Sequence, residues 1–499
     1  MDIFSGLLSG FQIVFKPENF LYCFIGVFIG TLIGVLPGIG PSGAMAMLLP
    51  TTFGLSPASS IIMLAGIFYG AQYGGSTTSI LVNIPGEASS IVTCLDGYQM
   101  AKQGRAGPAL GIAAFGSLIG GTISIIGLMF LALPLAEIAV AFGPPEYFSL
   151  ISLTMVLSIY LSQGSLFKSF IMIIVGLILS TVGMDLVSGK TRFTFGCGTL
   201  IDGIGLVPVA MGLFGVSEVL VNLEESLERV IFKAKIKNLL PNREDWKKSI
   251  GPIARGTFLG FPLGILPGGG AIIASFVSYS LEKKISKTPE RFGNGAIEGV
   301  AGPETANNAA AGGSFIPLLA LGIPPNVVMA LLMGALIIHG ITPGPLMIQQ
   351  HPEVFWGVVA SMYIGNVMLL LLNLPLIGLW VKLLKVPYRI LMPLILLFCL
   401  IGSYSLNNNV VEVIIMIIFG IAGYVLRKLE FEAAPLMVAF ILGPILENSW
   451  RQSLVISSGS FFVFLEKPIS LGALLLAFFI IVNALVKYYR KKKKRLIFE

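Results

Sequence analysis

Two stretches of the sequence concentrate polar side chains between apolar runs. Residues 69–90 read YGAQYGGSTTSILVNIPGEASS, and residues 301–326 read AGPETANNAAAGGSFIPLLALGIPPN. The candidate residues in them are hydroxyls, amides and the carboxylate of Glu304: Ser76, Thr77, Thr78, Ser79, Asn83, Glu304, Thr305, Asn307, Asn308 and Ser314. Hydroxyl and amide groups can donate hydrogen bonds to a bound carboxylate, and their oxygens can hold Na⁺. Serine and threonine in apolar helices more often bond to the backbone or a neighbouring helix, but two dense clusters favour a binding site.

Glu304 is the strongest single candidate for binding a proton or a cation. An acidic side chain at bilayer depth is costly, and it usually serves as a proton or cation handle. Thr305 and Ser79 are the further candidates for ion coupling. If Glu304 instead continues the polar loop that begins at Glu282, it is an ordinary surface residue. The sequence leaves both alternatives open.

Each polar cluster follows a proline- and glycine-rich interruption of an apolar run. Residues 30–40 read GTLIGVLPGIG, and residues 260–270 read GFPLGILPGGG. Proline removes a backbone donor and clashes with the preceding turn, while glycine adds backbone freedom. We therefore expect each helix to unwind and restart, so that a half-helix N-terminus near Ser42 presents free N–H groups to an anion. A lone glycine would more simply permit close helix crossing, but the repeated clusters favour a site.

The composition places the chain in a lipid bilayer. It is 55% hydrophobic and 11% charged, with a mean hydropathy of +0.90. These values predict an all-α polytopic membrane protein with about 10–12 membrane segments. The duplicated motifs predict two homologous halves with broken helices or re-entrant hairpins, and we favour inverted repeats. The predicted parts are a first membrane repeat (1–221), a basic cytoplasmic loop (222–251), a second membrane repeat (252–486) and a basic cytoplasmic tail (487–499).

Charge and motif content narrow the function classes. The basic loop and tail should be cytoplasmic under the positive-inside bias. The net charge of +7 indicates contact with a membrane surface and not with nucleic acid. No HExxH, GxSxG or Walker A motif is present, so we predict no enzyme, no cofactor and no structural metal. The first 20 residues have no basic n-region and no small-residue cleavage site, so we predict no signal peptide there. Their apolar spacing suits either an interfacial helix or the start of the first span.

Three segments resemble the signature segments of TctA, the large membrane subunit of tripartite tricarboxylate transporters. They are YGGSTTSILVNIPGE, GVLPGIGPSGAMAMLLPTTF and GPETANNAAAGGSFIPLLALGIP. The resemblance implies a multi-pass protein of the bacterial inner membrane that imports citrate-like tricarboxylates or related carboxylates by symport with Na⁺ or H⁺. It also implies a TctC-like periplasmic solute-binding protein and a TctB-like small membrane subunit. The second copy reads LPGGGAIIA where the first has PSG, so the halves should contribute unequally.

The resulting hypothesis is one carboxylate site where the two broken hairpins meet. The first half would supply Gly40, Ser42, Gly43, Gly75, Ser76, Thr77, Thr78 and Asn83, and the second Gly269, Gly270, Asn307, Asn308, Gly313 and Ser314. Half-helix dipoles and bound cations would balance the substrate charge. The alternatives are a carboxylate-permeable channel and a carrier for a different organic anion. Elevator and rocking mechanisms both stay open.

Overall fold

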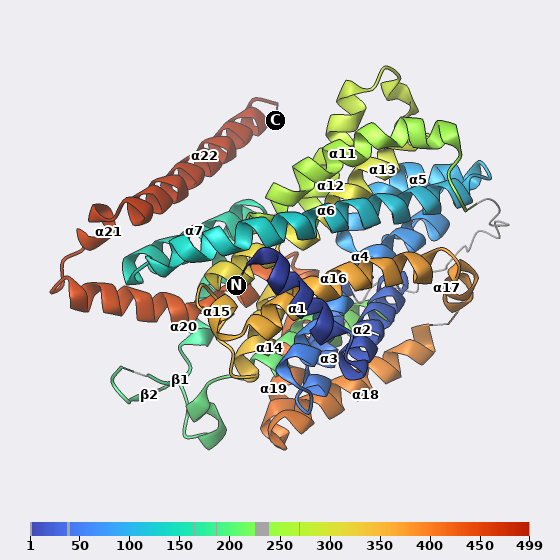
Figure 1. Cartoon of the computed structure of the whole chain (residues 1–499). Coiled ribbons are helices and arrows are strands. Elements are labelled where there is room, and N and C mark those ends of the chain that lie inside the picture. Colours follow the sequence, from blue (N-terminus) through green and yellow to red (C-terminus); the bar gives the residue numbers. More distant parts are fainter. Residues whose placement is uncertain are drawn as a thin grey trace. The chain divides into compact units, whose positions relative to one another are not determined.

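The structure, a computed structural model, describes residues 2–36, 40–162, 165–185, 187–224, 239–268, 270–384, 386 and 388–498. The described chain is almost entirely helical, with one two-stranded antiparallel hairpin in which Gly183 pairs with Arg192 (Figure 1). This confirms the all-α prediction. The predicted loop, residues 222–251, lies partly outside the described residues, as do Pro37–Ile39 and Gly269 of the two interruptions.

The elements follow one another in chain order. The first group is α1 (Ile3–Val14), α2 (Pro17–Val35), α3 (Gly40–Leu48), η1 (Leu49–Thr52), α4 (Pro57–Val82), η2 (Ala88–Ser90), α5 (Ile91–Lys102), α6 (Ala106–Val140), α7 (Pro144–Tyr160) and α8 (Leu166–Ser180). Next come β1 (Gly183–Met184), β2 (Thr191–Arg192), η3 (Gly198–Asp202), α9 (Leu206–Ala210), η4 (Met211–Val216), α10 (Ser217–Glu224), α11 (Arg243–Ile265), α12 (Gly270–Ile285), η5 (Pro289–Arg291), α13 (Glu298–Gly313) and η6 (Pro317–Leu321). The last group is α14 (Val327–Ile338), α15 (Met347–Gln350), α16 (Pro352–Asn373), α17 (Ile377–Leu383), α18 (Tyr388–Asn407), α19 (Val410–Lys428), α20 (Ala433–Ile456), α21 (Val463–Glu466) and α22 (Pro468–Phe498).

Six helical segments are long and apolar enough to cross a bilayer. They are Pro17–Val35, Ala106–Val140, Leu206–Glu224, Pro352–Asn373, Val410–Lys428 and Ala433–Ile456. Five shorter apolar helices accompany them among the described residues. Helix α19 exposes Ile414, Ile418 and Ile421 on its surface, as expected of a helix that faces lipid. The protein is therefore a multi-pass membrane protein, while the count of 10–12 segments and the inverted repeat stay predictions.

The chain forms two compact units, and each takes segments from both predicted halves. Unit 1 comprises Met1–Ala136 and Gly205–Val425, and unit 2 comprises Glu137–Ile204 and Leu426–Glu499. The predicted polar clusters and both interruptions belong to unit 1. The predicted domain boundaries stay predictions.

Helices end and restart at both proline- and glycine-rich interruptions. Helix α2 ends at Val35 and α3 begins at Gly40; helix α11 ends at Ile265 and α12 begins at Gly270. Gly40 and Gly270 have φ values of 64° and 39°, which residues other than glycine rarely adopt. The interruptions therefore separate each apolar run into two helices, as the sequence predicts.

The helix before each interruption packs closely on a later helix through glycines. On α2, a Cβ at Gly30 would lie 2.5 Å from the Ile67 oxygen of α4, and one at Gly34 would lie 2.3 Å from the Ala71 oxygen. On α11, a Cβ at Gly260 would lie 2.2 Å from the Ala306 oxygen of α13. These helical glycines therefore serve the close backbone approach that small residues permit.

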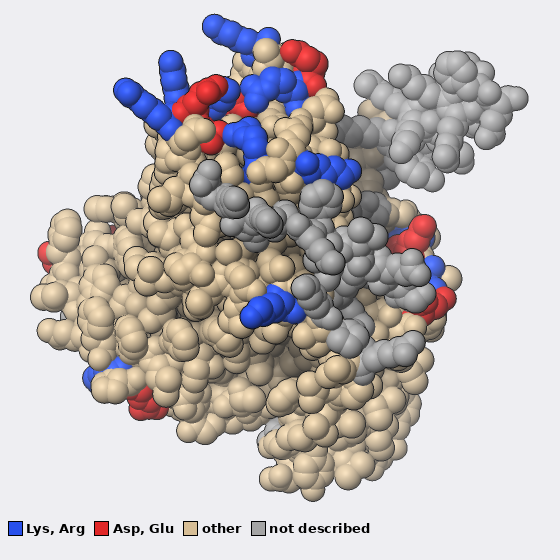
Figure 2. Space-filling model, turned by 90° about the vertical axis from the view of Figure 1, so that its right-hand side faces the viewer, with Lys and Arg blue, Asp and Glu red and all other residues tan. Residues whose placement is uncertain are grey.

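Charged side chains mark one end of unit 1. Arg105 at the start of α6 pairs with the buried Asp245 at the start of α11, and Gln103 donates a hydrogen bond to the Asn294 carbonyl at 2.8 Å. Exposed basic residues at this end are Lys102, Arg243, Lys247, Lys283, Lys284 and Lys287. Figure 2 shows charged side chains gathered at the top of the view and a mostly uncharged face below them.

Unit 2 is built on helices α7, α8, α20 and α22. Its apolar core contains Ile151 and Met155 of α7, Ile173 of α8, and Val438 and Leu442 of α20. Beside this core, the β1–β2 hairpin is tied to α20 by four charged side chains. These ion pairs hold the hairpin against the helix.

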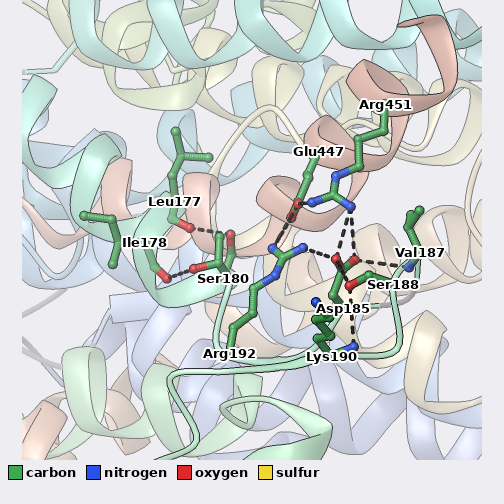
Figure 3. A network of polar contacts seen from close by, with 11 residues as sticks. Leu177, Ile178, Ser180, Asp185, Val187, Ser188, Lys190, Arg192, Glu447 and Arg451 are labelled. Atoms are coloured by element: carbon green, nitrogen blue, oxygen red, sulfur yellow. Dashed lines mark hydrogen bonds and ion pairs between the residues drawn. The ribbon is translucent and has the colours of Figure 1, made fainter. Parts of the chain in front are cut away.

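The four charged side chains alternate in sign (Figure 3). Asp185 contacts Arg192 at 2.6 Å and Arg451 at 3.1 Å, and Glu447 contacts the same two arginines at 2.9 and 2.7 Å. Hydrogen bonds from Ser188 and Arg192 hold the pKa of the Asp185 carboxyl well below its usual range. The hairpin thus depends on the ionised form of Asp185.

A glycine in the α2–α4 crossing should tolerate no methyl group. Gly30→Ala places a Cβ against backbone oxygen, and we expect a loss of about 1–3 kcal/mol of stability. Thermal unfolding in detergent measures it. Gly54→Ala is the matched control because a Cβ there meets nothing within 4 Å. Equal unfolding temperatures for the two variants would contradict the close-packing argument.

Asp185→Asn should destabilise the protein at neutral pH and not in acid. Because the folded-state pKa lies below the unfolded value of about 3.9, the contribution is complete above that value and declines as the pH falls through the folded pKa. Unfolding temperatures of wild type and variant should therefore differ at pH 7 and converge towards pH 2. Asp202→Asn, at an exposed position, controls for loss of a charge, and a constant difference across pH would rule out this explanation.

Candidate functional site

Glu304 lies in the interior of unit 1, on helix α13. Its side chain has no exposed surface. It accepts hydrogen bonds from the Ser76 hydroxyl of α4 at 2.5 Å, the Thr93 hydroxyl of α5, and the Asn307 amide one turn along α13 at 3.4 Å. The alternative that Glu304 is a surface residue is therefore wrong, and three hydroxyl and amide donors from three helices surround its carboxylate.

The local sequence explains how α13 reaches the interior. The helix reads EGVAGPETANNAAAGG, and its residues from Gly299 to Gly313 are all buried. Small side chains let it approach α11, and they also admit α6, where a Cβ at Gly120 would lie 2.5 Å from the Thr305 oxygen. The polar residues are thus carried on a helix whose other positions are nearly all glycine or alanine.

The two asparagines of α13 extend the polar cluster to α6. The Asn308 amide donates to the Ser117 hydroxyl of α6 at 2.8 Å and to the Asn307 side-chain oxygen at 2.6 Å. It also reaches the Glu304 carbonyl at 3.0 Å. The predicted residues Ser76, Glu304, Asn307 and Asn308 therefore form one hydrogen-bonded cluster.

A small pocket adjoins this cluster. It is lined by Tyr73, Ser76, Thr77, Leu110, Ala113, Ala114, Ser117, Asn373 and Leu374. The Tyr73 hydroxyl and the Asn373 side-chain oxygen are buried and have no hydrogen-bond partner among the described residues. Buried polar atoms usually have partners, so these two groups are available to a bound molecule. The space between these side chains holds about one water molecule, so a larger ligand requires the lining helices to move apart.

The electrostatics of the site are unusual for a buried acid. Among the ion pairs of the described residues, none joins Glu304 to lysine, arginine or histidine. Hydroxyl and amide donors alone stabilise a buried carboxylate less than a paired cation does. The site can therefore accept a positive charge, either as a proton or as a small cation.

Thr78 and Ser79 make hydrogen bonds away from the pocket. The Thr78 hydroxyl donates to the Val35 carbonyl at 2.6 Å, at the last residue of α2. The Ser79 hydroxyl donates to that of Ser90 at 2.9 Å. Thr78 thus satisfies a carbonyl that the interruption of α2 leaves without a helical partner, and a direct role in binding for either residue stays a prediction.

The remaining predicted residues do not line the pocket. Thr305 and Ser314 donate to carbonyls of their own helical segment, those of Ala301 and Ala311, each at 2.7 Å. Asn83 is exposed at the left-handed C-cap of α4. The predicted glycines have separate positions: Gly40 and Gly43 with Ser42 begin α3, Gly270 begins α12, Gly75 contacts Glu87, Gly313 packs on Phe261, and Gly269 lies outside the described residues.

Sequence reasoning missed Thr93, Ser117 and Asn373, and it quoted Tyr73 without assigning a role. Ser117 stands among apolar or small neighbours, so no local density of polar residues marks it. Thr93 lies three residues beyond Ser90, the last residue of the first polar stretch. The Tyr73 position shows a weak signal, since it lies within the first polar stretch one helical turn before Thr77. Side chains four residues apart share a helix face, which could have drawn Tyr73 into the site.

Two curated relatives and one family model match the chain. The family model described as tripartite tricarboxylate transporter TctA family matches residues 20–438. The "Uncharacterized 52.8 kDa protein in TAR-I ttuC' 3'region" of Agrobacterium vitis is 53% identical over 499 residues, covering 100% of this chain and 99% of that protein. The "Uncharacterized protein in TAR-II ttuC' 3'region" of the same organism is 55% identical over 237 residues, covering 48% of this chain and 98% of that protein. No solved structure matches the chain.

Ser76→Ala should destabilise the protein more than Ser314→Ala does. Ser76→Ala removes a hydrogen-bond donor to the buried Glu304 carboxylate. The Ser314 hydroxyl only donates to the Ala311 carbonyl of its own helical segment. We expect a difference of about 1–3 kcal/mol, measured by thermal unfolding in detergent. Indistinguishable variants would mean that Glu304 does not depend on the Ser76 hydroxyl.

Proposed function

Because the chain belongs to the TctA family of tripartite tricarboxylate transporters, we propose that it is the large membrane subunit of a secondary active carrier for citrate-like tricarboxylates or related carboxylates. The observation that supports this most directly is the pocket beside Glu304. Tyr73, Ser76, Thr77, Ser117 and Asn373 line it. The Tyr73 hydroxyl, which has no partner among the described residues, can donate a hydrogen bond to a carboxylate oxygen without a charged side chain.

Two features favour a carrier coupled to cation entry. A substrate with two or three negative charges needs compensation, and the pocket lining includes no lysine or arginine. A proton or Na⁺ bound near Glu304 would supply positive charge and favour admission of the anion. The proposed symport thus uses the buried carboxylate for the cation and the adjoining hydroxyls for the substrate.

The proposed assembly has two further subunits. Family membership indicates a tripartite system, and we propose a TctC-like solute-binding protein that delivers the carboxylate and a TctB-like small membrane subunit. We place the protein in the bacterial inner membrane. The basic end of unit 1 and the basic tail would face the cytoplasm, as the positive-inside bias favours.

The test is uptake of radiolabelled citrate into proteoliposomes. The chain is reconstituted with and without its two proposed partners, under an inward Na⁺ or H⁺ gradient. We expect saturable accumulation above equilibrium that needs both the partners and the gradient. Uptake of another carboxylate alone would change the substrate assignment, non-saturable equilibration would indicate a channel, and no carboxylate uptake by the correctly folded complex would refute the function.

Tyr73→Phe should weaken carboxylate uptake without harming the fold. It removes only a buried hydroxyl that has no partner among the described residues. Loss of one hydrogen bond to a charged ligand costs about 1.5–3 kcal/mol, so we expect uptake efficiency to fall about 10- to 100-fold. Tyr363→Phe is the matched control, since that hydroxyl contacts the Met129 sulfur outside the pocket. Equal uptake by both variants would remove Tyr73 from the binding site.

A further inference from the structure

A second buried carboxylate, that of Glu87, lies in the interior of unit 1. Glu87 is the N-cap of η2, in the segment that follows α4. The residue is 8% exposed, and its Oε1 atom is fully buried without a hydrogen-bond partner among the described residues. An unpartnered carboxylate oxygen in the interior is costly, so its position needs an explanation beyond helix capping.

Glycine 75 brings Glu87 against the helix that carries Ser76. A Cβ at Gly75 would lie 2.8 Å from the Glu87 Cγ atom. The next residue, Ser76, donates its hydroxyl to Glu304. The Glu87 side chain therefore lies against the same turn of α4 whose next residue contacts the Glu304 carboxylate.

Neutral oxygen atoms fill the surroundings of the two acids. Ser79 donates to Ser90 at 2.9 Å, and Ser90 in turn donates to the Glu87 carbonyl at 2.8 Å. Thr93, one turn after Ser90 in the chain, donates to Glu304. Carboxylate, hydroxyl and carbonyl oxygens are the atoms that hard cations prefer as ligands.

No fixed positive charge balances these two acids among the described residues. Neither Glu87 nor Glu304 has an ion pair there with lysine, arginine or histidine. The other titratable groups that interact with Glu304 are Tyr73 of α4 and Cys94 of α5. Both are neutral when protonated, so neither can neutralise a carboxylate.

We propose that Glu87 and Glu304 together form a binding site for one monovalent cation, a proton or Na⁺, with the Glu87 Oε1 atom as a ligand. Two adjacent buried carboxylates cannot both stay ionised without a positive charge between them. A single bound cation removes the repulsion and gives Oε1 its missing partner. That this cation drives carboxylate entry rests on the proposed function, whereas the binding itself does not.

The positions of Glu87 and Glu304 suggest how cation binding affects the neighbouring pocket. Ser76 both donates to Glu304 and lines the pocket. A cation between the acids changes the charge that the Ser76 hydroxyl faces, which in turn alters the donor available to a substrate. The cation and carboxylate sites are thus neighbours that share one side chain.

Thermal unfolding of the purified protein tests cation binding without reference to transport. Wild type, Glu87→Gln, Glu304→Gln and the exposed control Glu290→Gln are heated in NaCl or choline chloride between pH 8 and pH 6. If the cation is Na⁺, wild type and control gain stability that saturates with NaCl and not with choline. If it is a proton, they gain stability as the pH falls, because the folded state takes up a proton.

In either case Glu87→Gln and Glu304→Gln should lose the gain. The same NaCl and pH dependence in Glu87→Gln as in wild type would overturn the site. Glutamine keeps the shape of the side chain, and the unfolding transition of each variant reports whether it folds.

Transport separates this inference from the proposed function. With Glu87→Gln, we expect gradient-driven citrate accumulation in proteoliposomes to fall at least tenfold, whereas the exposed control Glu290→Gln should accumulate citrate within about twofold of wild type. If wild-type protein binds the cation but moves no carboxylate, the proposed function fails and the cation site stands. If Glu87→Gln accumulates citrate as wild type does, the coupling role of Glu87 is refuted.

Discussion

The close packing of two helix pairs is the constraint on which the site depends. Glycines of α2 meet backbone oxygens of α4, and glycines of α11 meet those of α13. In a bilayer, such packing replaces the hydrophobic driving force that helices lack in lipid. It brings the polar segments of α4 and α13 into the same interior, where Ser76 reaches Glu304. A side chain at any of these glycines would collide with the backbone of the facing helix and push the two helices apart. The polar residues of α4 and α13 would then no longer meet.

The interior that results is polar but short of positive charge. Glu304 and Glu87 are buried carboxylates, and their described neighbours are hydroxyls, amides and backbone groups. Two buried, ionised carboxylates without a bound cation raise the free energy of the folded protein, and a cation that binds between them lowers it. The adjoining pocket offers the neutral Tyr73 hydroxyl as a donor to an anion. In the proposed symporter, the bound cation lowers the electrostatic free energy of binding the anionic substrate, and the substrate does the same for the cation. This mutual stabilisation is a physical basis for coupling.

Much of the architecture follows from local physical rules. Long apolar runs predict membrane helices because backbone groups in lipid must be satisfied within the segment. Proline and glycine at 37–40 and 267–270 predict the helix ends that the structure has at Val35 and Ile265. The family assignment from three quoted segments is confirmed. By contrast, the inverted repeat, the domain boundaries and the substrate remain predictions.

The sequence by itself determined the class of protein, the helix interruptions and two segments rich in candidate ligands, because each depends on residues close together in the chain. Only the tertiary structure decided which ligands converge. Thr78 and Thr77 are adjacent in sequence, yet Thr78 caps α2 while Thr77 lines the pocket. The burial of Glu304 and its contact with Thr93 join residues of different helices. Such contacts depend on helix rotation and crossing, which long-range packing sets and local sequence does not encode.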